Sequence, residues 1–178
     1  MDLTVVIPTK GRSSLACTLD SIPSWVEVIV VADGEEAWGK VSKICKYVRL
    51  YQTGPSAIGH PQRMFGMKKA RGEWLAFMDD DDVYTPDAFD AFKQHQDSEL
   101  PVIFKMRFED GVELWKDQAV SEGNVGTPMI LCRNIPSKLG VWQPKRCGDY
   151  DFIHETVMLN GGAVWDETVV CDIGRDRG

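Results

Sequence analysis

The chain has 178 residues, of which 43% are hydrophobic and 26% are charged, as is typical of one globular domain with a substantial core. Its net charge of −7 and the lack of a basic stripe argue against a nucleic-acid partner. The five cysteines form no C-x-x-C pair, which favours reduced thiols over a zinc site or a disulfide framework. Because the first strand begins at Leu3 and no apolar stretch approaches about 18 residues, we expect a cytoplasmic protein without a signal peptide or a membrane-spanning segment.

The first half of the chain alternates apolar, β-branched runs with segments of helical periodicity, joined by short polar turns. This alternation predicts an α/β fold with a doubly wound parallel sheet and right-handed crossovers. We expect strands at 3–8, 26–32, 47–51 and 73–78, helices at 13–22, 36–46 and 61–71, and a loop at 53–60.

The second half has a different pattern, which indicates mixed α+β structure. We expect a helix at 85–96, paired strands at 102–108 and 112–115, a strand at 127–132, a helix at 149–159, and strands at 163–165 and 168–171. The predicted fold is therefore a central, mostly parallel sheet flanked by helices, with a smaller α+β half. No linker or repeat divides the chain, so we expect a single domain, 1–178, made of the halves 1–98 and 99–178.

Four consecutive aspartates, Asp79 to Asp82, directly follow the last strand of the first half. Two like charges about 5 Å apart repel by roughly 3 kcal/mol at an effective dielectric constant near 20. A hard cation, Mg²⁺ or Mn²⁺, would remove this penalty and would in turn hold a diphosphate. The alternative is a solvated acidic loop before a helix. Polar turns at 9–12 and 33–35 end at the same edge of the sheet, so the three turns would surround one ligand.

Four segments, in this order and spacing, resemble the family 2 glycosyltransferases of the GT-A fold. They are the opening strand and loop at 5–12, the second strand ending in Asp33-Gly34, the segment 63–73 that resembles the family's Ala-Arg-Asn helix, and the Asp-x-Asp-like run at 77–82 with Pro86. Gly148-Asp149 is a weaker fifth segment.

The resemblance implies transfer of a sugar from a nucleotide-diphosphate donor with the help of Mn²⁺ or Mg²⁺, and a UDP-sugar is favoured over a dTDP- or GDP-sugar. The acceptor would be a hydroxyl group of a saccharide, a lipid or a protein. The family's positions correspond to Thr9 and Asp33 for the base, Arg63 for base or phosphate, Lys10 and Arg12 for phosphate or the base loop, Asp80 for the ribose or the metal, and Asp81 and Asp79 for the metal.

The chain departs from the family pattern at three points. Ala32 replaces the first Asp of the usual Asp-Asp-Gly, which removes one expected base or ribose contact. The run of four aspartates leaves the metal register ambiguous by one residue, and the spacing to Pro86 favours Asp81 as the direct ligand. No histidine near the end of the sequence matches the one that sometimes completes the metal site, and Asp172 is a weak substitute.

An inverting transfer needs a base that deprotonates the acceptor hydroxyl. The family's base begins a helix in the second half, where this chain has Gly148-Asp149-Tyr150-Asp151. Asp149 is the predicted base, because it follows the glycine, and Asp151 is the rival. The alternative is that both acids only stabilise the helix N-terminus.

Two other functions remain open at this point: a retaining enzyme on the same fold, and a non-catalytic nucleotide-sugar binding module. Ala32 and a C-terminal half that is short for the family motivate the second. A dinucleotide-dependent oxidoreductase is disfavoured, because no G-x-G-x-x-G follows the first strand.

Overall fold

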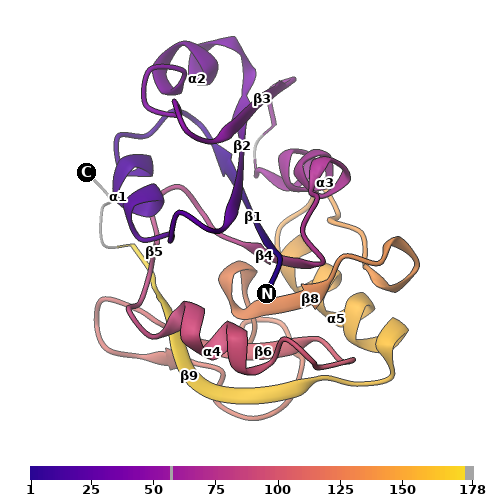
Figure 1. The fold of residues 1–178 in the computed structure, drawn as a ribbon. Coiled ribbons are helices and arrows are strands. Elements are labelled where there is room, and N and C mark those ends of the chain that lie inside the picture. Colours follow the sequence, from indigo (N-terminus) through magenta and orange to yellow (C-terminus); the bar gives the residue numbers. More distant parts are fainter. Residues whose placement is uncertain (57, 175–178) are drawn as a thin grey trace.

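The computed structural model describes residues 1–56 and 58–174. Residue 57 of the predicted 53–60 loop and residues 175–178 of the predicted 1–178 domain lie outside the described residues. The described strands form one nine-stranded sheet in the order β3-β2-β1-β4-β8-β6-β9-β5, and β7 pairs with β6 (Figure 1). One continuous hydrophobic core accompanies this sheet through both halves of the chain.

The first four strands are parallel, as the alternating pattern predicts. β1 is buried at every position and lies between β2 and β4, which is how an uninterrupted apolar run is accommodated in a parallel sheet. β3 pairs with the outer side of β2. The bounds are β1 Leu3–Thr9, α1 Leu15–Asp20, β2 Glu27–Asp33, α2 Gly34–Val41, β3 Arg49–Thr53, α3 His60–Lys69 and β4 Trp74–Phe77.

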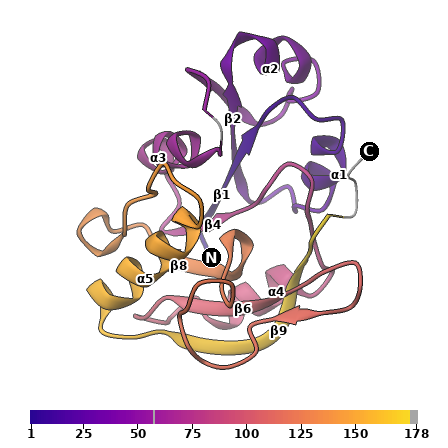
Figure 2. The same ribbon diagram turned by 180° about the vertical axis from the view of Figure 1, so that it is seen from behind.

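The second half adds antiparallel pairs to the sheet. β8 runs antiparallel to β4 and β6, whereas β9 is parallel to β6 and antiparallel to β5. The bounds are β5 Val83–Tyr84, α4 Ala88–Gln94, β6 Val102–Arg107, β7 Glu113–Leu114, η1 Thr127–Met129, β8 Ile130–Arg133, η2 Pro136–Lys138, α5 Gly148–Asn160 and β9 Val164–Asp172. Figures 1 and 2 place α3 and α5 on the same side of the molecule and α1 on the other.

Several predicted boundaries are wrong for identifiable reasons. The strand expected at 127–132 begins with the 3₁₀ turn η1, because Pro128 cannot donate to a ladder. The strands expected at 163–165 and 168–171 are one strand, β9, whose register against β6 shifts at the Asp166-Glu167 pair. The strand expected at 47–51 lies two residues later, and Tyr47 is 99% exposed.

The segment after the acidic run also differs from expectation. Val83 and Tyr84 form the short strand β5, and the Thr85 hydroxyl donates to the Val169 carbonyl at 2.7 Å instead of capping a helix. α4 therefore begins at Ala88 rather than at Thr85. No helix of the described residues is long and apolar enough to cross a membrane.

The contact between α3 and β1 holds the helix that carries Arg63 against the sheet. Gly66 permits this contact, since a Cβ atom built on it would lie 2.3 Å from Cγ1 of Val6. We expect Gly66→Ala to reduce the free energy of unfolding by about 1–3 kcal/mol, because overpacking outweighs the gain in helix propensity. Urea unfolding measures the change.

Gly39 in α2 is the matched control, because no atom lies within 4 Å of a Cβ built there. Gly39→Ala should be neutral or stabilising by up to about 1 kcal/mol. Equal effects of the two substitutions would contradict the packing argument.

Candidate active site

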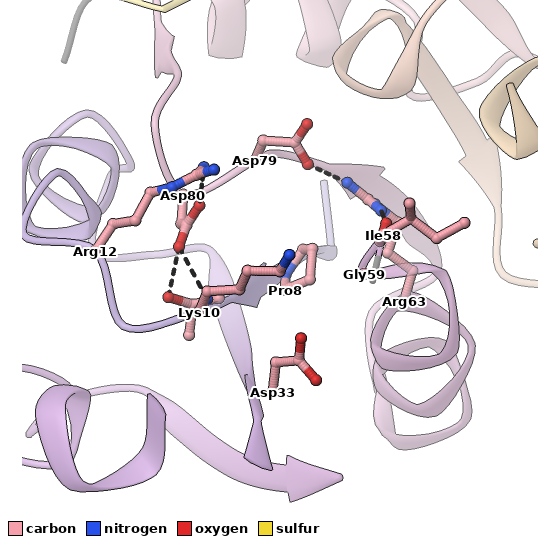
Figure 3. A pocket seen from close by; sticks show the side chains of 10 residues that line it. Pro8, Lys10, Arg12, Asp33, Ile58, Gly59, Arg63, Asp79 and Asp80 are labelled. Atoms are coloured by element: carbon pink, nitrogen blue, oxygen red, sulfur yellow. Dashed lines mark hydrogen bonds and ion pairs between the residues drawn. The ribbon is translucent and has the colours of Figure 1, made fainter. Parts of the chain in front are cut away.

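A cavity of about 160 Å³ opens where β1, β2 and β4 end (Figure 3). This is the edge at which an open α/β sheet binds its ligands. Its lining residues are Pro8, Thr9, Lys10, Arg12, Asp33, Ile58, Gly59, Arg63, Asp79 and Asp80. Seven of the nine residues predicted to form the site therefore line one cavity, and only Asp81 and Asp149 are outside its lining.

Asp80 fastens the loop after β1 to the loop after β4. Its side chain is buried, and Oδ2 accepts hydrogen bonds from the Thr9 hydroxyl at 2.6 Å and from the Lys10 backbone N–H at 3.2 Å. Oδ1 accepts from Nη1 of Arg12 at 2.8 Å. The ribose or metal contact that the resemblance implies for Asp80 would have to share these oxygens, so its structural role is to shape the cavity wall.

Two arginines partly neutralise the acidic run. Nη1 of Arg12 lies 2.8 Å from both Asp80 Oδ1 and Asp81 Oδ2, and Arg63 forms an ion pair with Asp79. Burial disfavours the charge on Arg12, but the two adjacent carboxylates outweigh it and raise the Arg12 pKa. The pKa of the Asp81 carboxyl is also raised. Burial and the nearby charges of Asp79 and Asp80 disfavour its ionised form more than Arg12 favours it.

Asp33 ends β2 and contributes its carboxylate to the cavity. Its Oδ1 accepts from the Ser56 backbone N–H at 2.5 Å and from Nε2 of Gln62 at 2.9 Å. The Asp33 side chain is thus held by one donor from the loop after β3 and one donor from α3. Sequence reasoning did not single out Gln62, because its role depends on the meeting of three elements that are distant in the chain.

Asp149 is in the first turn of α5, as the sequence predicted, and lies beside His60. A Cβ atom built on Gly148 would lie 2.5 Å from Nδ1 of His60, so α5 begins against this imidazole. Burial and the charge of Arg63 lower the His60 pKa, whereas the charge of Asp149 raises it. The rival, Asp151, is paired with Lys145 at 2.8 Å.

A buried aromatic cluster connects this helix with α3. Trp142 is 2% exposed and stacks on Phe152 of α5 with ring centroids 4.4 Å apart. The His60 ring meets the same indole edge-on at 5.4 Å, and the Arg63 guanidinium lies over it at 5.0 Å. The cluster fixes the start of α5 relative to the cavity. His60, which the sequence placed in a loop, is the first residue of α3 and is buried.

The acidic loop offers carboxylate oxygens, the donors that Mg²⁺ and Mn²⁺ prefer. Within residues 1–56 and 58–174, no three His, Cys, Asp or Glu side chains are grouped to hold a metal ion. A cation there would therefore need one or two carboxylates together with phosphate and water, which is a common arrangement for Mg²⁺ in phosphate sites.

The model of the family described as glycosyl transferase family 2 matches residues 4–143. The chain belongs to glycosyl transferase family 2. This match contains the cavity lining and the acidic run, but it ends before Asp149. A comparison with curated protein sequences finds no match.

Solved structures confirm the expected GT-A fold of this family 2 member. Residues 1–349 of TarS from S. aureus superpose with a TM-score of 0.76 at 19% identity, over 97% of this chain and 60% of that one. TarS in complex with UDP-GlcNAc gives 0.70 at 18% identity, over 100% and 60%. The mannosyltransferase PcManGT from Pyrobaculum calidifontis, in complex with GDP-Man and Mn²⁺, gives 0.70 at 18% identity, over 99% and 57%. The chain thus spans at most 60% of the length of these proteins.

The raised pKa of Asp81 predicts a stability cost that depends on pH. A carboxyl whose folded pKa is raised destabilises the fold when it is ionised, and this cost disappears as the pH falls through the folded pKa. We expect Asp81→Asn to raise the thermal midpoint of the ligand-free chain at pH 7, on the order of 1–3 °C. The increase should vanish near pH 3.

Asp97, an exposed residue after α4, provides the matched control. Asp97→Asn should leave the midpoint unchanged at both pH values. A lower midpoint for Asp81→Asn at pH 7 would contradict the expectation and would show that the ion pair with Arg12 outweighs burial and repulsion.

Proposed function

We propose that this chain transfers a sugar from a nucleotide-diphosphate sugar, with a UDP-sugar favoured, to a hydroxyl group of an acceptor. The observation that carries the proposal is the single cavity in which Asp33, two arginines and the acidic run meet. These groups have the chemistry of a nucleoside diphosphate site: a carboxylate for a base N–H, cations for phosphate, and oxygen ligands for a divalent ion.

The structural neighbours support the donor class without fixing the nucleotide. One TarS structure contains UDP-GlcNAc, and the PcManGT structure contains GDP-Man and Mn²⁺. Uridine is favoured here because the resemblance assigns Thr9 and Asp33 to the base, and Asp33 lines the cavity as an acceptor for an imide N–H. Lys10 and Arg12 line the same cavity and are proposed phosphate or base-loop contacts.

We assign the cation, Mn²⁺ or Mg²⁺, to Asp81 and Asp79. When bound, it would supply positive charge to the departing diphosphate. Each of these carboxylates now faces an arginine, Arg12 for Asp81 and Arg63 for Asp79. A guanidinium that shifts from carboxylate to phosphate keeps its bidentate hydrogen-bonding capacity, so both arginines are suited to hold the donor once the acids are occupied.

Asp149 is the proposed base of an inverting transfer. Its carboxylate would take the proton of the acceptor hydroxyl while that oxygen bonds to the anomeric carbon and the bond to the diphosphate breaks. The His60 and Trp142 contacts hold the start of α5 at the side of the cavity where Arg63 lies. Asp151 is less suited, because Lys145 already neutralises it.

Two alternatives make different predictions. A retaining enzyme gives a product with the anomeric configuration of the donor, which NMR of the product determines. A non-catalytic binding module would bind a nucleotide sugar without turnover against any acceptor. The acceptor class, saccharide, lipid or protein, and the cytoplasmic location stay predictions from the sequence.

Substituting Asp149 tests the base assignment. Asp149→Asn should reduce kcat by about 10²–10⁴, because the acceptor hydroxyl loses its proton acceptor. The Kd for the donor should stay within about twofold, since Asp149 is outside the cavity lining. Transfer from UDP-sugars to an acceptor panel and calorimetric donor binding measure the two effects.

Asp151→Asn is the matched control, two residues along the same helix, and it should retain most of the activity. If Asp149→Asn transfers sugar at the wild-type rate, or if Asp151→Asn shows the larger loss, the base assignment is wrong.

A further inference from the structure

Gln62 is a fully buried amide at the point where β2 and β3 end and α3 begins. Its Nε2 donates to Asp33 Oδ1 and to the Thr53 hydroxyl, both at 2.9 Å, and approaches the Gly54 carbonyl at 3.3 Å. These three acceptors fix the orientation of the amide, with the nitrogen towards Asp33. Gln62 does not itself line the cavity.

The consequence for Asp33 is that its two oxygens are not equivalent. Oδ1 accepts from Nε2 of Gln62 and also from the Ser56 backbone N–H at 2.5 Å. Oδ2 has no hydrogen-bond partner among the described residues, and the side chain is directed towards the space between Lys10 and Arg63 (Figure 3). Asp33 therefore presents one free acceptor oxygen to the cavity.

The buried amide of Gln62 lowers the stability of the fold. Its Oε1 is buried and has no hydrogen-bond donor among the described residues, and an unsatisfied buried acceptor is destabilising. An apolar side chain of similar length would fill the site without this penalty. The amide instead provides the hydrogen bonds from Nε2, and of their acceptors Asp33 is the one that lines the cavity.

We propose that Gln62 is a positioning residue that sets the nucleobase preference of the cavity by leaving Asp33 a single free oxygen. One acceptor matches the single imide N–H of uracil or thymine. Guanine presents two adjacent donors, N1–H and the N2 amino group, and a carboxylate satisfies them only with both oxygens. Adenine and cytosine present a ring nitrogen lone pair, which a carboxylate repels. This inference rests on the proposed function and names the residue that would determine which nucleotide the donor carries.

Calorimetric titration of UDP and GDP, each with Mn²⁺, tests the proposal on the wild type, two single variants, their double variant and a control variant. Gln62→Met keeps the length of the side chain and removes the donor. We expect it to weaken UDP binding about tenfold, as for a misplaced charge-assisted hydrogen bond, while the GDP affinity is unchanged or higher. The UDP-to-GDP preference should therefore fall. A role in fold stability alone would not change this ratio.

Asp33→Asn identifies the atom through which Gln62 acts. The Ser56 and Gln62 donors hold the amide oxygen at the Oδ1 position, so Oδ2 is replaced by an NH₂ group that cannot accept the imide N–H. We expect a loss of UDP affinity of about tenfold or more. The double variant should bind UDP no more weakly than Asp33→Asn alone, because coupled residues are not additive.

Gln52→Met, at an exposed position of β3, is the matched control and should bind both nucleotides like the wild type. An unchanged UDP-to-GDP preference in Gln62→Met, or additive losses in the double variant, would overturn the inference while leaving the proposed function intact. A wild type that binds GDP more tightly than UDP would overturn the inference alone, and a wild type that binds neither nucleotide would overturn both.

Discussion

The repulsion among four adjacent aspartates at one end of β4 is the constraint on which the site depends. Each of these carboxylates is met by a donor from another part of the chain. Arg63 of α3 pairs with Asp79, and Arg12 from the loop after β1 bridges Asp80 and Asp81. Asp82 Oδ1 accepts from the backbone N–H of Gly174, beyond β9. The acidic run thereby gathers segments from both halves of the chain around one cavity.

The four acids nevertheless have different surroundings. Asp80 and Asp82 are each 4% exposed and bond mainly to loops that they hold in place. Asp79 and Asp81 are paired with arginine side chains, which are the partners that can shift to another anion. The raised pKa of Asp81 shows that Arg12 does not fully relieve its charge. In the proposed function, a bound cation would relieve this charge, and the stability lost in the ligand-free chain would contribute to the affinity for the cation and the diphosphate.

The sequence was sufficient for those parts of the fold that depend on local patterns. The apolar runs of β1, β2 and β4 and the polar turns after them predicted the parallel sheet, and seven of the residues predicted for the site line one cavity. Local patterns did not predict those features of the structure that depend on tertiary contacts. Asp166-Glu167 has the composition of a turn, but it forms an irregularity within β9. There, Nε2 of His95 lies 2.7 Å from Oδ2 of Asp166. Gln62 has no local signal at all, since its partners are in β2 and the segment after β3.

We propose that the acidic cavity binds a nucleotide sugar together with a divalent ion. The most direct test is the thermal midpoint of the chain with UDP, dTDP, GDP and ADP and their sugars, each with Mn²⁺ and with a chelator. We expect a rise with uridine nucleotides that requires Mn²⁺, because the ion would complete the charge balance between the aspartates and the diphosphate. No rise with any nucleotide in the presence of Mn²⁺ would contradict this proposal, and the acidic run would then serve only to hold the surrounding loops together.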